Sequence, residues 1–319
     1  MGERLERRIR WRSGGAVASI RRHVGLDSPD RRIRLLGALA LLGAAAGLAA
    51  FGFYLVRDTL IDVNAYWEAG ARLNAGEPLY PEGADPDVAS FYRYPPLLAI
   101  LFRPLALLPF PVAAVIWETL VVASLVLTVR RLGIDRISTW QAVGILGVAI
   151  GWAVAIGQAQ VVVTWLVTLG SPWAVALAGN LKVFPWLVAL FWLGRGDWRA
   201  VGLFTAWTAG LLAFQLVLEP ANTVAFFQSL TLDQVGEVEN LSPYGISPVL
   251  WAVLAVAGFV AVLALARTRW GWATAVAYSV LVVPRLMTYM LMTLLAALRA
   301  PGPAQDQARA GAPVAPARE

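Results

Sequence analysis

The chain has 319 residues, of which 59% are hydrophobic and only 14% are charged. Soluble domains are about 25% charged, so this composition indicates an integral membrane protein. The sequence has no cysteine and one histidine, His23, which argues against a disulfide framework, a thiolate nucleophile and a histidine-cluster metal centre. We therefore expect no metal and no cofactor. The net charge of +6 arises within residues 1–34, so it does not indicate a nucleic-acid partner.

Residues 1–34 form a basic tail with ten arginines and four acids, which the positive-inside bias favours in front of a first membrane span. The tail lacks the short apolar core and small-residue cleavage site of a signal peptide, so we expect it to stay cytoplasmic. Apolar segments follow near 35–57, 95–129, 138–156, 158–170, 172–193, 200–218, 247–266 and 270–298.

These segments predict an all-α, polytopic helical membrane protein with about eight to ten membrane helices, forming one domain over 35–298. A full span needs ~20 apolar residues, so 95–108 and 158–170 predict half-helices, re-entrant segments or interfacial helices. The segment 95–108 is not expected to cross the membrane. The segment 270–298 either crosses once or breaks at Pro284 into two helices.

The distribution of charge between the segments predicts the orientation in a plasma membrane. Arginines cluster at 130–136, 195–199 and 267–269, which places these connections in the cytoplasm with the N-terminus. The acidic loops 58–94 and 219–245 then lie outside. Residues 299–319 are rich in Ala, Pro, Gly and Gln, and we expect a disordered tail.

The first outer loop has the strongest chemical signal. Between residues 58 and 94 it carries seven carboxylates against two arginines. Apolar and aromatic residues at 63, 66, 67, 70 and 73 predict a short helix along the membrane surface that stops at Gly76. Asp62 falls in its first turn, where it could act as a general base. The alternative is that Asp58 or Asp62 only caps the helix.

Several polar residues also occur inside or beside apolar segments. Lys182 is the only lysine of the chain and lies three residues before Pro185. A charge at that depth usually faces a polar cavity, where it could bind a phosphate, although a lysine can also snorkel to the headgroups. Arg285 lies directly after Pro284 within 270–298, and the same reasoning applies to this second cation. Gln158 either lines a cavity or bridges helices, and Tyr94 belongs either to a site or to an aromatic belt.

The order of these motifs resembles glycosyltransferase family 87, the polyprenol-phosphate-mannose-dependent mannosyltransferases of the GT-C fold. The matching segments run from Asp62 to Tyr80, then Tyr94-Pro95-Pro96-Leu97, Pro104 to Pro109, Gly157-Gln158-Ala159-Gln160, Leu181-Lys182-Val183-Phe184-Pro185 and Arg195 to Ala200. The resemblance covers roughly residues 35–215 well. Residues 283–289 depart from the family pattern, because they lack the histidine that relatives often carry there.

The resemblance implies an inverting transferase that moves a hexose, in this family mannose, from a polyprenyl-phosphate donor to a lipid or glycan acceptor outside the cytoplasm. By position it implies Asp62 as the general base, with Asp58 as a competitor four residues earlier. Lys182 and Arg285 would bind the donor phosphate. Tyr66, Trp67, Tyr94 and Gln158 would line the substrate site.

Two other functions remain open from the sequence. The chain could be a polyprenyl-lipid flippase or transporter in which Lys182 and Arg285 line a phosphate path, or an inactive GT-C-like scaffold for cell-envelope synthesis. Transporters often consist of two matching halves, and the sequence shows no such self-similarity. In all three cases the partners would be membrane lipid and lipid-linked substrates, with no nucleic acid.

Overall fold

The computed structural model describes residues 17–81, 92–230 and 240–299, and within these ranges every regular element is a helix. The prediction of an all-α, polytopic membrane protein is therefore confirmed. Four helices are long and apolar enough to cross a membrane: α2 (Arg31–Arg57), α5 (Phe110–Leu132), α11 (Trp198–Leu218) and α13 (Pro248–Leu265). The structure does not describe residues 82–91, 231–239 and 300–319. Several outer-loop acids and the expected disordered tail therefore lie outside the described residues.

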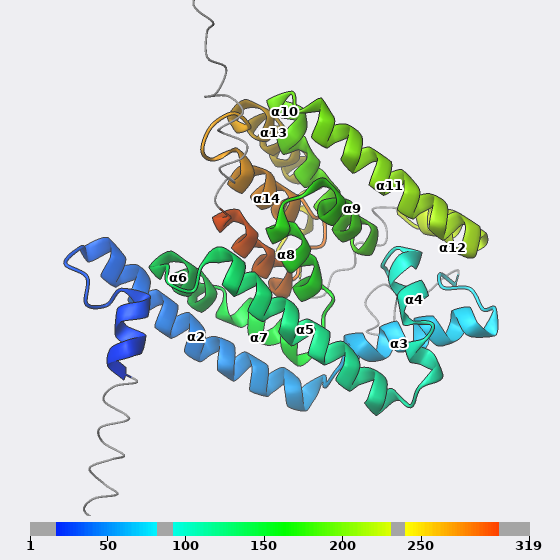
Figure 1. Ribbon diagram of the computed structural model, residues 1–319, viewed down its shortest axis with the longest axis horizontal. Coiled ribbons are helices and arrows are strands. Elements are labelled where there is room, and N and C mark those ends of the chain that lie inside the picture. The colour runs from blue at the N-terminus through cyan, green and yellow to red at the C-terminus, as the bar shows by residue number, and fades with distance from the viewer. Residues whose placement is uncertain (1–16, 82–91, 231–239, 300–319) are drawn as a thin grey trace, which may run out of the picture.

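The predicted segment 138–156 is two helices, α6 (Ile137–Ile145) and α7 (Gly147–Ala155), which bend by 64° and would together make a fifth span. Both pack along α2 (Figure 1). The contact is backbone to backbone: a Cβ on Gly147 would lie 2.3 Å from the carbonyl oxygen of Gly43. Only small residues allow two helices to approach this closely, as in other membrane helix pairs.

Several other apolar segments form short helices in place of spans. They are α8 (Gln160–Leu169), α9 (Pro172–Leu181), η2 (Phe184–Ala189), α10 (Leu190–Arg195), α14 (Gly271–Leu281) and η5 (Thr288–Leu298). At 1.5 Å per residue, ten residues reach ~15 Å, about half of a ~30 Å hydrocarbon layer. Helix ends and the irregular backbone between them therefore lie within the thickness of the bundle, where they line interior space.

The apolar segment 172–193 is not one continuous helix. Helix α9 ends at Leu181, and Lys182 has an extended backbone with φ −158° and ψ 104°. Pro185 explains the break, because it has no N–H to donate to Leu181 and its ring clashes with that carbonyl. The segment 270–298 breaks as well, between α14 and η5, which is the two-helix alternative at Pro284.

The expected outer segments form a layer at one end of the bundle, between the end of α2 and α12 (Pro220–Gln228) (Figure 1). Helix α3 (Ile61–Ala75) ends at Gly76, whose φ of +74° a glycine adopts without strain. The predicted short helix and its stop at Gly76 are confirmed. Helix α4 (Pro96–Phe102) has seven residues and is followed by η1 (Leu105–Leu107), so 95–108 is too short to cross. A last short turn, η4 (Pro243–Gly245), precedes α13.

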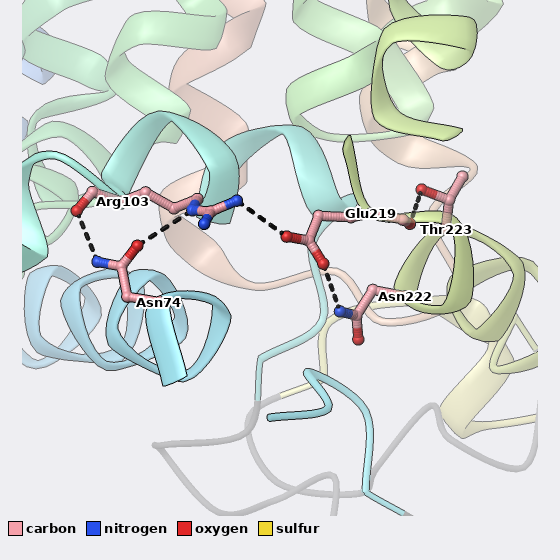
Figure 2. Close-up of polar contacts among 5 residues, drawn as sticks. All are labelled: Asn74, Arg103, Glu219, Asn222 and Thr223. Atoms are coloured by element: carbon pink, nitrogen blue, oxygen red, sulfur yellow. Dashed lines mark hydrogen bonds and ion pairs between the residues drawn. The ribbon is translucent and has the colours of Figure 1, made fainter. Parts of the chain in front are cut away.

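A polar network fastens this outer layer to α11 (Figure 2). Arg103 donates from Nε to Asn74 on α3 and from Nη1 to Glu219 at the end of α11, both at 3.1 Å. Asn222 donates to the second oxygen of Glu219 at 3.0 Å and accepts from the N–H of Leu79 at 2.9 Å. Glu219, which was expected in an acidic loop without basic residues, therefore pairs with a cation from the first outer segment.

Candidate active site

The centre of the candidate site is Gln158, which is fully buried in the turn between α7 and α8. Its Nε2 donates to Asp62 Oδ2 at 3.0 Å. Its Oε1 accepts from the hydroxyls of Tyr66 at 2.7 Å and Tyr94 at 3.0 Å. One amide on the α7–α8 turn thus joins three of the predicted site residues, two from α3 and one from the segment before α4.

Backbone contacts set the position of Asp62. Its N–H donates to the carbonyl of Ile156 at 3.2 Å, and the N–H of Leu60 donates to Ala155 at 3.4 Å. These bonds dock the first turn of α3 onto the end of α7. The helix begins after Leu60, whose φ is +53°, and has no side-chain cap. The capping alternative for Asp58 and Asp62 is therefore not what the structure contains.

Lys182 brings a positive charge to the same cluster. Its ammonium lies 5.2 Å from the ring centre of Tyr94 and 4.9 Å from that of Tyr289, the second residue of η5. Nζ is buried and has no hydrogen-bond partner among the described residues. Aromatic faces stabilise a cation by about 0.5–2 kcal/mol, whereas an isolated buried ammonium loses several kcal/mol of hydration. The described residues therefore leave the hydrogen-bond donors of this cation without an acceptor.

The electrostatics of Asp62 fit a proton acceptor. Burial raises the pKa of its carboxyl to about 7, although the positive charges of Lys182 and Arg93 act in the opposite direction. A carboxyl with a pKa near neutrality is ionised in an appreciable fraction of molecules and still binds a proton readily. Desolvation and a specific charge partner together are typical of functional sites.

The other predicted site residues lie around or beyond this cluster. Tyr66 is completely buried and holds Gln158, so its ring packs within the protein, against Tyr94, Phe102 and Trp117. Trp67 donates to the carbonyl of Leu108 at 3.2 Å, on the side of α3 toward α5.

Two further predicted residues lie at the end of a helix or between two helices. Asp58 ends α2, with Oδ2 3.8 Å from Nε of Arg57. Arg285 lies in the irregular segment between α14 and η5, four residues before Tyr289.

Two residues beside the cluster were missed. Tyr289 gave no distinguishing signal, because its contact with Lys182 exists only through the packing of η5. Glu118 did give a signal, as the only acid in the span α5. Its carboxylate lies against Gly157, where an added Cβ would be 2.4 Å from Oε1. Among the described residues, no group of three or more His, Cys, Asp and Glu could hold a metal ion.

The chain is similar in sequence to two mycobacterial mannosyltransferases. The chain is 28% identical over 235 residues to the polyprenol-phosphate-mannose-dependent alpha-(1-2)-phosphatidylinositol pentamannoside mannosyltransferase of Mycolicibacterium smegmatis, covering 67% of this chain and 56% of that protein. It is 30% identical over 212 residues to the corresponding phosphatidylinositol mannoside mannosyltransferase of Mycobacterium tuberculosis, covering 55% of this chain and 50% of the relative.

The chain thus spans about half the length of these relatives. No solved structure matches it. The model of glycosyltransferase family 87 matches residues 91–300, which is more than half of the 319 residues. The chain belongs to glycosyltransferase family 87.

Proposed function

We propose that the protein is a membrane hexosyltransferase that moves mannose from a polyprenyl-phosphate donor to a lipid or glycan acceptor. The observation that carries this proposal is the meeting of Asp62 and Lys182 around Gln158 and Tyr94. A buried proton acceptor near a buried cation that has no hydrogen bond among the described residues suits a reaction in which a hydroxyl is deprotonated and a phosphate departs. Membership of family 87 and the names of the two relatives support the same donor.

In the proposed reaction, Asp62 accepts the proton of the acceptor hydroxyl. The hydroxyl oxygen attacks the anomeric carbon of the mannose, and the bond from that carbon to the phosphate oxygen breaks. The electron pair leaves with polyprenyl phosphate, and the configuration at the anomeric carbon inverts. Gln158 holds one oxygen of the carboxylate, so the base is oriented before the acceptor arrives.

The ammonium of Lys182 would face the donor phosphate and stabilise the negative charge that grows on it as the bond breaks. Its contacts with Tyr94 and Tyr289 leave its hydrogen-bond donors unoccupied by the described residues. We assign Arg285 to the same phosphate, since the segment that carries it leads directly into η5. Tyr94 and Trp67 would contact the sugar, and Tyr66 would act through Gln158.

The distribution of charge supports a site that faces outward, with the N-terminus in the cytoplasm. The arginines at the inner ends of α5, α10 and α13 lie in short connections, while the cluster lies under the outer layer of α3 and α4. A polyprenyl chain would enter sideways from the lipid. This orientation rests on the positive-inside bias.

The test uses the purified full chain in lipid nanodiscs with radiolabelled polyprenyl-phosphate mannose and phosphatidylinositol mannoside acceptors. We expect label to appear in the acceptor, and Asp62→Asn to abolish this transfer without loss of folded protein. Reconstituted vesicles distinguish the alternatives. Movement of the donor across the bilayer without any transfer would support a flippase, and the absence of both would support a scaffold.

A further inference from the structure

Glu118 is a charged residue that the proposed chemistry does not use. It is the only acid in α5, a helix long and apolar enough to span the membrane. It lies eight residues after Phe110, which at 1.5 Å per residue is ~12 Å along the helix. An ionisable side chain near the middle of a bilayer costs roughly 2.5–3.5 kcal/mol on insertion scales, so a span rarely carries one without a use.

The carboxylate is placed beside the turn that carries Gln158. Trp117, the preceding residue, donates from its indole to the carbonyl of Gly157 at 2.7 Å. Oε1 of Glu118 and a methyl of Val63 both occupy the space next to Gly157, within 2.4 Å of where a Cβ would be. Asp62 is held by Gln158, the residue after Gly157, so Glu118 and Asp62 each lie against one of two consecutive residues of this turn.

One oxygen of this carboxylate, Oε1, is buried and lacks a hydrogen-bond partner among the described residues. Leaving a buried polar atom unpaired costs about 1–3 kcal/mol, and more for a charged group. A proton relay would need a hydrogen-bonded neighbour, and a metal would need further ligands, of which the described residues offer no cluster. A ligand that donates a hydrogen bond to Oε1 fits both the missing partner of this atom and the lack of further metal ligands among the described residues.

Glu118 lies on the boundary between the buried and the lipid-facing sides of α5. One turn away in each direction, Ala114 and Val121 are 3% and 0% exposed. On the other side, Val115 and Val122 are 67% and 48% exposed. The carboxylate therefore borders a seam that a lipid could enter sideways.

We propose that Glu118 accepts hydrogen bonds from sugar hydroxyls in the headgroup of a membrane glycolipid, and so forms a binding position for the acceptor beside Asp62. The inference rests on the proposed transferase function. Carboxylates are strong acceptors for hydroxyl groups, and such charge-assisted bonds contribute about twice as much as neutral ones. The position on a lipid-bordering seam selects an acceptor that stays in the membrane.

Binding is measured without any donor, so that the result does not depend on turnover. Labelled phosphatidylinositol mannoside is titrated into nanodiscs that carry the wild type, Glu118→Gln or Thr119→Val. Thr119 is the matched control, because it is the next residue on the same helix and bonds only within its own turn, to Val115. We expect Glu118→Gln to raise the Kd by about 10–100-fold, with Thr119→Val unchanged and phosphatidylinositol without mannose unaffected.

A second measurement changes the ligand and leaves the protein intact. Among deoxy analogues of the mannoside, removal of one hydroxyl should weaken binding to the wild type about as much as Glu118→Gln does. The same analogue should cause no further loss in Glu118→Gln. Equal binding by Glu118→Gln and the wild type, or wild-type binding that ignores every deoxy analogue, would overturn the proposal. Mannoside binding that depends on Glu118 in a protein that transfers no sugar would instead refute the proposed function alone.

Discussion

Two polar clusters join the outer layer to the bundle, and they are built in opposite ways. In the network of Figure 2, Arg103 pairs with Glu219, and Asn74 and Asn222 add a hydrogen bond to each of them. Around Gln158, the carboxylate of Asp62 is held by an amide, while the ammonium of Lys182 rests on two aromatic rings without a hydrogen-bond partner in the described residues.

This difference indicates a structural role for the Arg103–Glu219 network and a functional role for the cluster around Gln158. A buried polar network that is fully paired stabilises one conformation and leaves nothing for a ligand. A buried charge without hydrogen bonds lowers stability, and a folded protein keeps it when a ligand completes the site. We therefore expect substitutions around Gln158 to affect transfer much more than folding, and substitutions in the Arg103–Glu219 network to do the reverse.

The largest effect is expected at Asp62. Asp62→Asn keeps the size of the side chain and its contact with Gln158 but removes the proton acceptor, so the transfer rate should fall by about 10²–10⁴-fold. The measurement is the initial rate of mannose transfer in nanodiscs, with thermal unfolding as the test of folding. Asp58→Asn is the matched control at the end of α2. If Asp58→Asn is inactive while Asp62→Asn transfers sugar, the base is Asp58.

The second largest effect on transfer is expected for Lys182→Met. Methionine keeps the length and the apolar contacts with Tyr94 and Tyr289 but has no charge for the donor phosphate. Loss of a hydrogen bond to a charged group corresponds to about 10–100-fold in kcat/KM for the donor. Because the buried ammonium has no hydrogen bond to lose among the described residues, we expect the Tm to stay constant or rise. A marked fall in Tm with normal donor kinetics would make Lys182 a structural residue.

The pH dependence of transfer also tests the cluster around Gln158. With a pKa of about 7, Asp62 is protonated below neutrality and cannot accept a proton. The rate should therefore rise with pH and level off above pH 7, changing about tenfold per unit on the acidic side. The measured quantity is kcat/KM for the acceptor from pH 5 to pH 8, because it reports the ionisation of the free enzyme. A flat profile over this range would show that the ionisation of Asp62 does not limit transfer.

The smallest effect on transfer is expected in the satisfied network. Glu219→Gln removes the charge that pairs with Arg103 while keeping the hydrogen-bonding shape, so the free energy of unfolding should fall by about 1 kcal/mol. Arg103→Met and the double variant complete a cycle that isolates the pair. Thermal unfolding in detergent gives the stability. A loss of transfer comparable with that of Lys182→Met, at unchanged stability, would contradict a purely structural role for the Arg103–Glu219 network.

The sequence determined the features that depend on local chemistry. Composition indicated a membrane protein, and Gly76 and the prolines near 104–111 marked where α3 ends and where α4 and α5 separate, because these residues restrict the backbone wherever they occur. The family resemblance singled out Asp62, Gln158 and Lys182. Their roles remain predictions, but the structure does bring them into one cluster.

Only the tertiary structure decided how these residues meet. The sequence could not show that the amide of Gln158 orients Asp62, or that Tyr289 lies against the ammonium, because each contact joins segments distant along the chain. Glu118 was visible in the sequence as an acid in an apolar span, but its place beside Gly157 was not. Local propensity ends with the individual helix. The packing of short helices within the membrane thickness created the space in which these side chains converge.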